Sequence, residues 1–486
     1  MNSKQSTRRR FLKQGATLAS LAAVGGIQTA RGQIAQGDTA GRVDYVPEES
    51  VPKEAIVRDP WTGEPLRDGE GNLVVDWTGT PQWETARKNV RAVGGPRYGT
   101  LEKDWRLYGY RARFVTSFRR GNDNGGPVEP STVKTGFFSL LSPLQDQLGT
   151  ITPNGLFFVD EHGEVPEVDP RQHRLTLFGM VDRPLTFTME ELMDMPSVCR
   201  IHTVECNSNG TPGHRNRLQP WATPGDIYGE LSCSEWTGVL LSTVMEIVGA
   251  RKGATWFWAQ SEEEFNSSTS LPLWKAMDDA LLVYGQNGEP LRPEQGYPLR
   301  LLVPGFQGNN NIKRLRKIKV TNEPGPFHRE SRTYTSQMPD NKISWFRFEM
   351  QPKSVILRPA GGQHLTRRGF YELRGVAWSG GGKVRRVEIT TDGGRTWKDA
   401  QVQEPVHSKA ITSFVFPWNW NGEEVMIASR CTDKRGTTQP TTAEMAKHWG
   451  VEPDRFKSGA MFVRFNVIQP WKIDREGRVT NAIFSI

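Results

Sequence analysis

The segment that most constrains this chain lies at its N-terminus, where TRRRFLK at residues 7–13 precedes an apolar, small-residue stretch at residues 15–27. An arginine pair before Phe-Leu-Lys and a short apolar run is typical of a twin-arginine export signal. The run is shorter than the roughly 20 residues that span a bilayer. Because proteins on this route fold before export, usually around a cofactor, we expect residues 1–32 to be a signal peptide, a periplasmic location, and a body that holds a cofactor.

Charge and cysteine usage exclude several classes. The formal charge is +8, and residues 1–32 carry six positive charges and no acid, which leaves 8 − 6 = +2 for the rest. A nearly neutral body gives no reason to expect nucleic acid or anionic lipid as a partner. The four cysteines include no Cys-x-x-Cys-His motif, so no c-type haem is attached to this chain. No later segment is apolar over enough residues to predict stable membrane insertion.

The remaining chain divides into three regions by composition. Residues 33–130 are rich in proline, glycine and charge, which predicts an extended N-terminal arm. Residues 131–345 alternate short apolar strands with helices, and residues 346–486 carry short strands separated by turn signals. We therefore predict an α+β fold, with a mixed cofactor-binding domain at residues 131–345 followed by an immunoglobulin-like β-sandwich at residues 346–486.

Local patterns support the mixed domain. Residues 174–181 alternate like a half-buried strand, and Thr188 with Glu191 forms a capping box that begins a short helix. A further strand predicted at residues 198–205 places Cys206 at its carboxyl end, in the sequence VECNSNG. A thiolate there, beside a Gly/Asn turn, suits a soft metal. A free cysteine is more often simply packed, so Cys206 alone leaves both interpretations open.

In the last region, strands are predicted at residues 371–378, 384–391 and 412–416. Glycine-rich turns at residues 379–382 and 392–394 separate them. This spacing suits an immunoglobulin-like sandwich that lacks the usual disulfide.

Several segments, in order along the chain, together resemble one family. They are TPNGLFFVDEH at residues 152–162, EWTGVLL at residues 235–241, NGEPLRPEQGYPLR at residues 287–300, the stretch at residues 303–315, and TDGGRTW at residues 391–397. They resemble the sulfite oxidase family of molybdenum enzymes and, within it, the molybdenum subunit of sulfane dehydrogenase. The resemblance implies a molybdopterin-binding domain, molybdenum-molybdopterin as cofactor, and a second domain used for dimerisation.

The resemblance also implies roles for individual residues. Cys206 would supply the protein thiolate to molybdenum, and Tyr334 and Asp160 take catalytic positions of this family. The residues implied to bind the cofactor are Phe158, Val159, Asp160, Glu161, His162, Cys206, Gln295, Arg300, Asn311, Ile312 and Lys313. The guanidinium fork of Arg300 suits a phosphate. Judged from the residues alone, other roles stay open: Arg300 could end a strand and pair with an acid, Lys313 could belong to a solvated basic face, and Tyr334 could simply be packed.

The chain departs from the family where substrate is held. Asp160 stands in place of an anion-binding arginine, and Val415 is the nearest match to an arginine of the second domain. Gly210 and Thr211 replace an arginine pair, and a carboxylate repels sulfite rather than binding it. The cofactor framework is therefore retained, whereas the anion pocket is rebuilt. Nearby basic candidates to compensate are His202, His214, Arg215 and Arg217.

These observations favour an exported oxidoreductase that oxidises sulfane sulfur or sulfite with oxygen from water. Since the chain has no haem motif, electrons would pass to a separate c-type cytochrome, and the substrate would be a small sulfur compound or sulfur on a carrier protein. Two alternatives stay open: a reductase of a sulfoxide or other oxo-anion, and a non-catalytic binding subunit of the same fold. The second domain predicts a homodimer or heteromer.

Overall fold

The computed structural model describes residues 117, 119–121, 137–162, 165–211, 215–261, 267–332, 334–337, 342–456 and 465–486, with short segments before residue 77. The chain forms two compact units, Met1–Thr116 and Ser117–Ile486. In the first unit, β1 (Ile27–Thr29) pairs with β4 (Val74–Asp76), and β2 (Gln33–Ala35) pairs with β3 (Val43–Tyr45). The predicted signal peptide at residues 1–32 and the predicted arm at residues 33–130 lie almost wholly outside the described residues.

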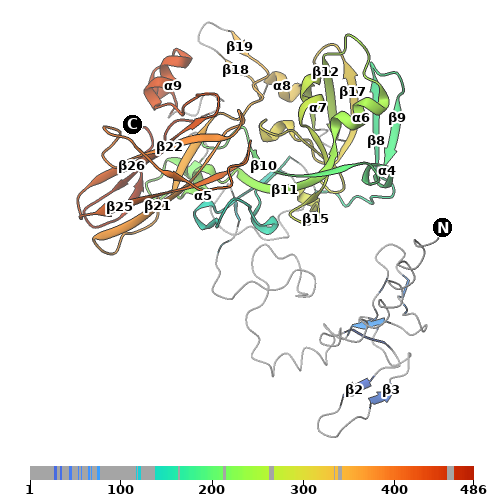
Figure 1. Cartoon of the computed structure of the whole chain (residues 1–486), viewed down its shortest axis with the longest axis horizontal. Helices are drawn as coiled ribbons and strands as arrows, with labels where there is room; N and C mark the ends of the chain where they lie inside the picture. Colours follow the sequence, from blue (N-terminus) through green and yellow to red (C-terminus); the bar gives the residue numbers. More distant parts are fainter. Residues whose placement is uncertain are drawn as a thin grey trace, which may run out of the picture. The chain divides into compact units, whose positions relative to one another are not determined.

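The second unit begins with a mixed domain built on three sheets (Figure 1). One sheet has the order β10 (Ser197–Glu205), β11 (Leu231–Leu240), β14 (Leu281–Gln286) and β15 (Glu289–Pro290), with β16 (Arg300–Leu302) also paired to β14. Another has the order β13 (Ser268–Pro272), β12 (Trp256–Ser261), β17 (Leu315–Thr321), β8 (Arg174–Gly179) and β9 (Leu185–Thr188). The smallest contains β5 (Arg120–Gly121), β6 (Phe137–Leu141) and β7 (Val159–His162). Strands β17 and β8 run parallel, so a crossover joins them.

Short helices connect these strands. They are α4 (Met189–Met193), α5 (Pro224–Tyr228), α6 (Leu241–Val248), α7 (Leu273–Asp278) and α8 (His328–Arg332). Single 3-10 turns are η4 (Leu144–Asp146), η5 (Asn154–Leu156), η6 (Arg215–Leu218), η7 (Pro293–Gln295) and η8 (Gly308–Asn310). The predicted capping box begins α4, because the Thr188 hydroxyl accepts from the Glu191 amide and the Glu191 carboxylate accepts from the Thr188 amide.

A sandwich of two antiparallel sheets follows. One has the order β20 (Lys353–Arg358), β21 (Gly369–Trp378), β25 (Thr412–Trp420) and β24 (Gln401–Val402). The other has the order β23 (Lys398–Asp399), β22 (Val384–Thr390), β26 (Val425–Asp433), β27 (Pro470–Ile473) and β28 (Val479–Asn481). Before it lie β18 (Ser336–Gln337) and β19 (Ile343–Ser344), and α9 (Thr442–Trp449) and η9 (Pro453–Phe456) follow β26. The predicted fold, a mixed domain followed by a sandwich, is confirmed.

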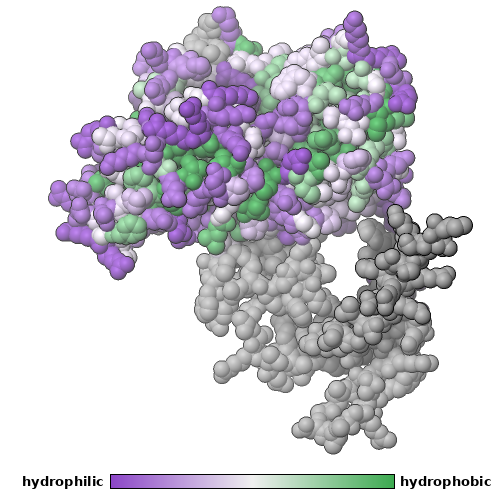
Figure 2. Space-filling view, viewed as in Figure 1, coloured by the Kyte–Doolittle hydropathy of each residue, from purple (hydrophilic) through white to green (hydrophobic). Residues whose placement is uncertain are grey.

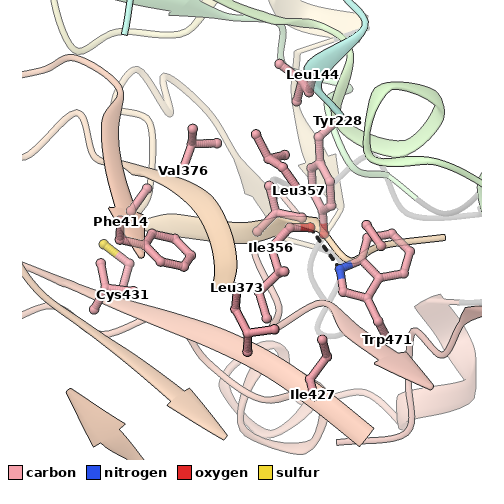
Figure 3. Close-up of a cluster of buried hydrophobic side chains, with 14 of the residues drawn as sticks. Leu144, Tyr228, Ile356, Leu357, Leu373, Val376, Phe414, Ile427, Cys431 and Trp471 are labelled. Atoms are coloured by element: carbon pink, nitrogen blue, oxygen red, sulfur yellow. Dashed lines mark hydrogen bonds between the residues drawn. The ribbon is translucent and has the colours of Figure 1, made fainter. Parts of the chain in front are cut away.

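The core of the sandwich extends into the first domain. Figure 3 shows Leu144 and Tyr228 of the first domain among apolar side chains from both sheets, where the Trp471 indole donates to the Ile356 carbonyl at 3.0 Å. On the face shown in Figure 2, hydrophobic residues of the described body gather toward the middle and hydrophilic residues surround them. Since the apolar contact is continuous across the two domains, it fixes one against the other. Among the described residues, no helix is long and apolar enough to cross a membrane.

Candidate functional site

The site begins at the carboxyl end of β10, which delivers Cys206 as predicted. The Cys206 amide donates to the Glu230 carbonyl at 3.0 Å, which ties this strand end to the start of β11. The backbone at Gly308 lies close beside it, because a Cβ there would meet the Glu205 carbonyl oxygen at 3.1 Å and the Cys206 Cα at 3.3 Å. Glycine at this position therefore lets the η8 turn approach the cysteine and form one wall of a pocket.

The pocket collects most of the residues predicted from the sequence. Its empty space, including the opening to solvent, is about 860 Å³. Predicted residues that line it are Phe158, Asp160, Glu161, Cys206, Gln295, Arg300, Asn311, Ile312, Lys313 and Tyr334. Val159 is buried and outside this lining, and the side chain of His162 lies outside the described residues. Lining residues that the sequence analysis missed are Val204, Ser267, Ser268, Gly308, Asn309, Arg314 and Arg329.

One end of the pocket is cationic. Glu161 on β7 pairs with Lys313 at 2.8 Å and with Arg314 at 2.9 Å. Burial acts to raise the pKa of Glu161, but these two cations outweigh it and hold that pKa below its usual value. Arg300 donates to the Gln295 carbonyl and side-chain oxygens at 3.2 and 3.1 Å, and its buried Nε has no hydrogen-bond partner. Lys313 and Arg314 share Glu161 and Arg300 adds a third cation, so this end suits an anionic group such as a phosphate.

The other end holds the cysteine. The Cys206 thiol donates to Asp160 Oδ2 at 3.4 Å and lies 3.4 Å from the Ser208 hydroxyl. Burial, followed by the charges of Glu230 and Asp160, raises the pKa of this thiol well above its usual value. Burial and Glu230 likewise raise the pKa of Asp160 to about 6. Without a cation at the sulfur, the thiol therefore stays protonated at neutral pH, and a bound metal would be what makes it a thiolate.

Tyr334 and Arg329 complete this end. Burial raises the pKa of the Tyr334 phenol, the Cys206 charge adds to the shift, and Arg329 opposes it by its charge and a hydrogen bond. Arg329 lies on α8, whose next residue, Glu330, is buried and accepts from the Ser270 amide and hydroxyl at 2.5 and 2.8 Å. These bonds fix α8 against β13, and they hold Arg329 at the pocket wall.

Other sequence candidates do not reach the pocket. Val415 lies on β25, opposite Arg374, and is not part of the lining. Arg217 is buried beside Glu230 at 3.2 Å and donates to the Ser208 carbonyl, so it supports the cysteine turn from behind. His202 lies on β10 opposite Ser234 of β11 and is not part of the lining. The candidates His214 and the side chain of Arg215 lie outside the described residues. The suggestion that His202 or Arg217 supplies the missing positive charge is therefore wrong.

The donor groups of the pocket fit a cofactor that carries a soft metal at one end and an anionic group at the other. The pocket presents a single thiol at one end and three cations at the other, and Arg300 keeps a buried donor without a partner. Phe158 and Ile312 supply apolar surface between the two ends. This donor set fits a molybdopterin whose molybdenum takes a protein thiolate and whose phosphate takes the guanidinium.

Two family profiles match the chain. One, described as "Oxidoreductase molybdopterin binding domain", matches residues 162–328, and the other, "Mo-co oxidoreductase dimerisation domain", matches residues 344–452. Together they cover both domains of the second unit.

Relatives and one solved structure agree with this assignment. Nitrate reductase [NADH] 1 of Phaseolus vulgaris is 32% identical over 60% of this chain and 38% of its own length. Mitochondrial sulfite oxidase of Mus musculus is 30% identical over 60% of this chain and 58% of its own length, so this chain spans less than two thirds of either relative. The structure of sulfane dehydrogenase SoxCD from Paracoccus pantotrophus superposes with a TM-score of 0.66 at 28% identity, covering 80% of this chain and 99% of that one. The chain belongs to the sulfite oxidase family of molybdopterin enzymes, and its fold matches that of a chain in the sulfane dehydrogenase SoxCD structure.

Proposed function

We propose that this chain is an exported molybdopterin-dependent oxidoreductase that oxidises a reduced sulfur compound, either sulfane sulfur or sulfite. The observation that carries the proposal is the Cys206 thiol at the end of a pocket whose wall also presents Tyr334 and Arg329. Bound molybdenum would supply two-electron oxidation with an oxygen atom that originates from water. The similarity to sulfane dehydrogenase SoxCD supports sulfur chemistry.

The chain's own residues would divide the work between the two ends. Cys206 would act as the protein ligand of the metal. Arg300, Lys313 and Arg314 would bind the anionic end of the pterin, since a guanidinium and an ammonium are strong donors to phosphate.

At the metal end, Arg329 and Tyr334 would hold the substrate anion. Both donate hydrogen bonds, and Arg329 has no ion-pair partner among the described residues, so its charge is available to an anion. Asp160 would oppose a doubly charged anion and favour a substrate with less charge at its reacting sulfur. Sulfane sulfur bound to a carrier satisfies this better than free sulfite.

Partners and location follow as parts of the same proposal. The chain has no haem motif, so the electrons would pass to a separate c-type cytochrome. The arginine pair at the N-terminus supports export to the periplasm by the twin-arginine route. The match of the second domain to a dimerisation profile supports a homodimer or a heteromer.

A second candidate is reduction of an oxo-anion. Nitrate reductases at 32–33% identity are among the relatives of this chain. In that case electrons would flow into the pocket from a donor rather than out of it.

The test uses holoenzyme purified from the periplasm, with the Cys206→Ser variant as control. Molybdenum and pterin are measured first, followed by turnover of thiosulfate and sulfite with oxidised cytochrome c. Reduction of nitrate and dimethyl sulfoxide by reduced viologen is measured in parallel. Sulfur oxidation that the variant lacks supports the proposal. Turnover of oxo-anions alone would favour the reductase, and folded protein without molybdenum would favour a binding subunit.

A further inference from the structure

We propose that the sandwich domain positions the metal-binding cysteine through Lys353, in addition to any role in dimerisation. The proposal rests on the assignment of Cys206 as the metal ligand. Lys353 is the first residue of β20 and is 4% exposed. Its ammonium enters the first domain and reaches the residues on both sides of the cysteine.

The contacts of Lys353 enclose the cysteine turn. Its Nζ lies 2.7 Å from Glu205 Oε1, directly before Cys206, and donates to the Asn209 carbonyl at 2.9 Å. The Asn209 side chain also donates to Glu205 Oε1 at 3.0 Å. The Asn209 amide donates to the Cys206 carbonyl at 3.1 Å, which closes the turn. One ammonium from the second domain thus fixes both ends of a turn with the cysteine inside it.

A second buried pair supports the same turn from the first domain. Glu230 accepts from the Ser208 hydroxyl at 2.7 Å and pairs with Arg217 at 3.2 Å. The Glu230 amide donates to the Asn209 side-chain oxygen at 3.2 Å, so the two networks meet at Asn209. If Lys353 is lost, Glu230 and Arg217 still support the turn at Ser208. Glu205, in contrast, becomes a buried charge without its cation.

This geometry predicts an effect on the position of the sulfur rather than on the chemistry directly. A buried carboxylate that loses its cation is relieved by taking up a proton or by moving toward water, and either change alters its hydrogen bonds to the turn. Glu205 adjoins Cys206, so its movement shifts the sulfur relative to the pocket. Lys353 is therefore a positioning residue, and the sensitive readouts are those of the sulfur and of the metal bound to it.

The matched control is Lys275, a second buried lysine. It is 1% exposed, lies 2.5 Å from Asp279 and donates to the Pro304 carbonyl at 2.7 Å, without touching residues 205–209. The variants are Lys353→Met and Lys275→Met, which remove the charge and keep an apolar chain of similar length. A double variant, Glu205→Gln with Lys353→Met, removes both charges and serves if Lys353→Met fails to fold.

The first measurement uses apo protein and needs no metal. Alkylation of Cys206 by iodoacetamide is followed by site-resolved mass spectrometry, with exposed Cys199 and buried Cys233 as internal references. We expect Lys353→Met to label Cys206 about tenfold faster than the parent, with Cys233 unchanged. Lys275→Met should lower thermal stability without this local change. Equal labelling of Cys206 in both variants would overturn the proposal.

The second measurement uses holoenzyme and records the Mo(V) paramagnetic resonance spectrum, which reports the metal–sulfur geometry. We expect a changed spectrum in Lys353→Met and the parent spectrum in Lys275→Met. A parent-like spectrum in Lys353→Met would overturn the proposal. If Cys206→Ser leaves the molybdenum spectrum unaltered, the assignment of the metal ligand fails instead, and the apo labelling still decides whether Lys353 positions the cysteine.

Discussion

Asp160 and Glu161 are neighbours on β7, yet the protein shifts their pKa values in opposite directions. Burial and Glu230 raise the pKa of Asp160 to about 6, whereas Lys313 and Arg314 outweigh burial at Glu161 and lower its pKa. Successive side chains of a strand point to opposite faces, so one carboxylate meets the cysteine and the other meets the cations. The comparison teaches that one short strand separates the metal end of the pocket from its anion end.

The largest expected effect comes from removing the thiol between these two environments. In Cys206→Ser a hard hydroxyl replaces a soft thiolate ligand, and we expect turnover to fall by roughly three orders of magnitude. Pterin should stay bound, because the cations at the other end remain in place. Elemental analysis, pterin fluorescence and X-ray absorption at the molybdenum edge measure these quantities. Turnover within a factor of two of the parent would remove Cys206 from the site.

The next effect concerns the anion end. Glu161→Gln leaves buried Arg314 and partly buried Lys313 without their carboxylate, and we expect a loss of about 3 kcal/mol in the unfolding free energy of apo protein. The lowered pKa of Glu161 gives the sign of the pH dependence. The contribution of the Glu161 carboxylate to stability is fully present above its unfolded-state pKa of 4.5. It is lost as pH falls through its lower pKa in the folded state. Urea unfolding should therefore show a smaller difference in unfolding free energy between parent and variant at pH 4 than at pH 7.

A matched control for that variant lies in the sandwich. Glu388 is also buried and pairs with Arg430 at 2.8 Å and Arg386 at 3.2 Å, far along the chain from the pocket. Glu388→Gln should lower stability by less, because Arg386 and Arg430 are partly exposed, and it should leave cofactor retention unchanged. If both variants release the cofactor equally, the cations beside Glu161 do not bind it.

The sequence reveals those parts of the site that depend on local pattern. Alternation predicts β8, a further strand is predicted before Cys206, and the capping box predicts the start of α4. Family motifs indicate Arg300 and Lys313, which the fold brings together with the cysteine. In these cases the deciding interactions lie within a few residues, or within motifs whose order is preserved.

The rest depends on contacts between distant segments. Arg329 reaches the pocket because Glu330 binds β13 some sixty residues earlier, and no local pattern reports this. Closeness in sequence was misleading for Arg217, which faces Glu230 behind the turn instead of the cavity. Lys353 belongs to another domain and reaches Glu205 across 148 positions. Charge that acts at a pocket is therefore poorly predicted by proximity along the chain.

At the metal end, Arg329→Gln tests whether the guanidinium replaces the anion-binding arginine that the family has at position 160. We expect the KM for sulfite or thiosulfate to rise about tenfold with little change in kcat, since a charge-assisted hydrogen bond is lost in ground and transition states alike. Arg329→Lys should recover part of the loss. A rise in KM that the lysine variant shares in full would point to displacement of α8 rather than to charge.

The smallest effect should come from Asp160→Asn, which changes one charge and almost no volume. Lys313 partly offsets the charge of Asp160, so we expect the substitution to remove a net repulsion of about 1 kcal/mol and to lower the KM for sulfite about fivefold. The KM for dimethyl sulfoxide, a neutral substrate of the alternative reaction, should not change. Opposite shifts of KM in Asp160→Asn and Arg329→Gln would show that the two groups compete over one anion. If both variants changed the KM for sulfite in the same direction, Asp160 would have a structural role in the pocket. Removing a negative and a positive charge cannot change anion binding in the same direction by electrostatics alone.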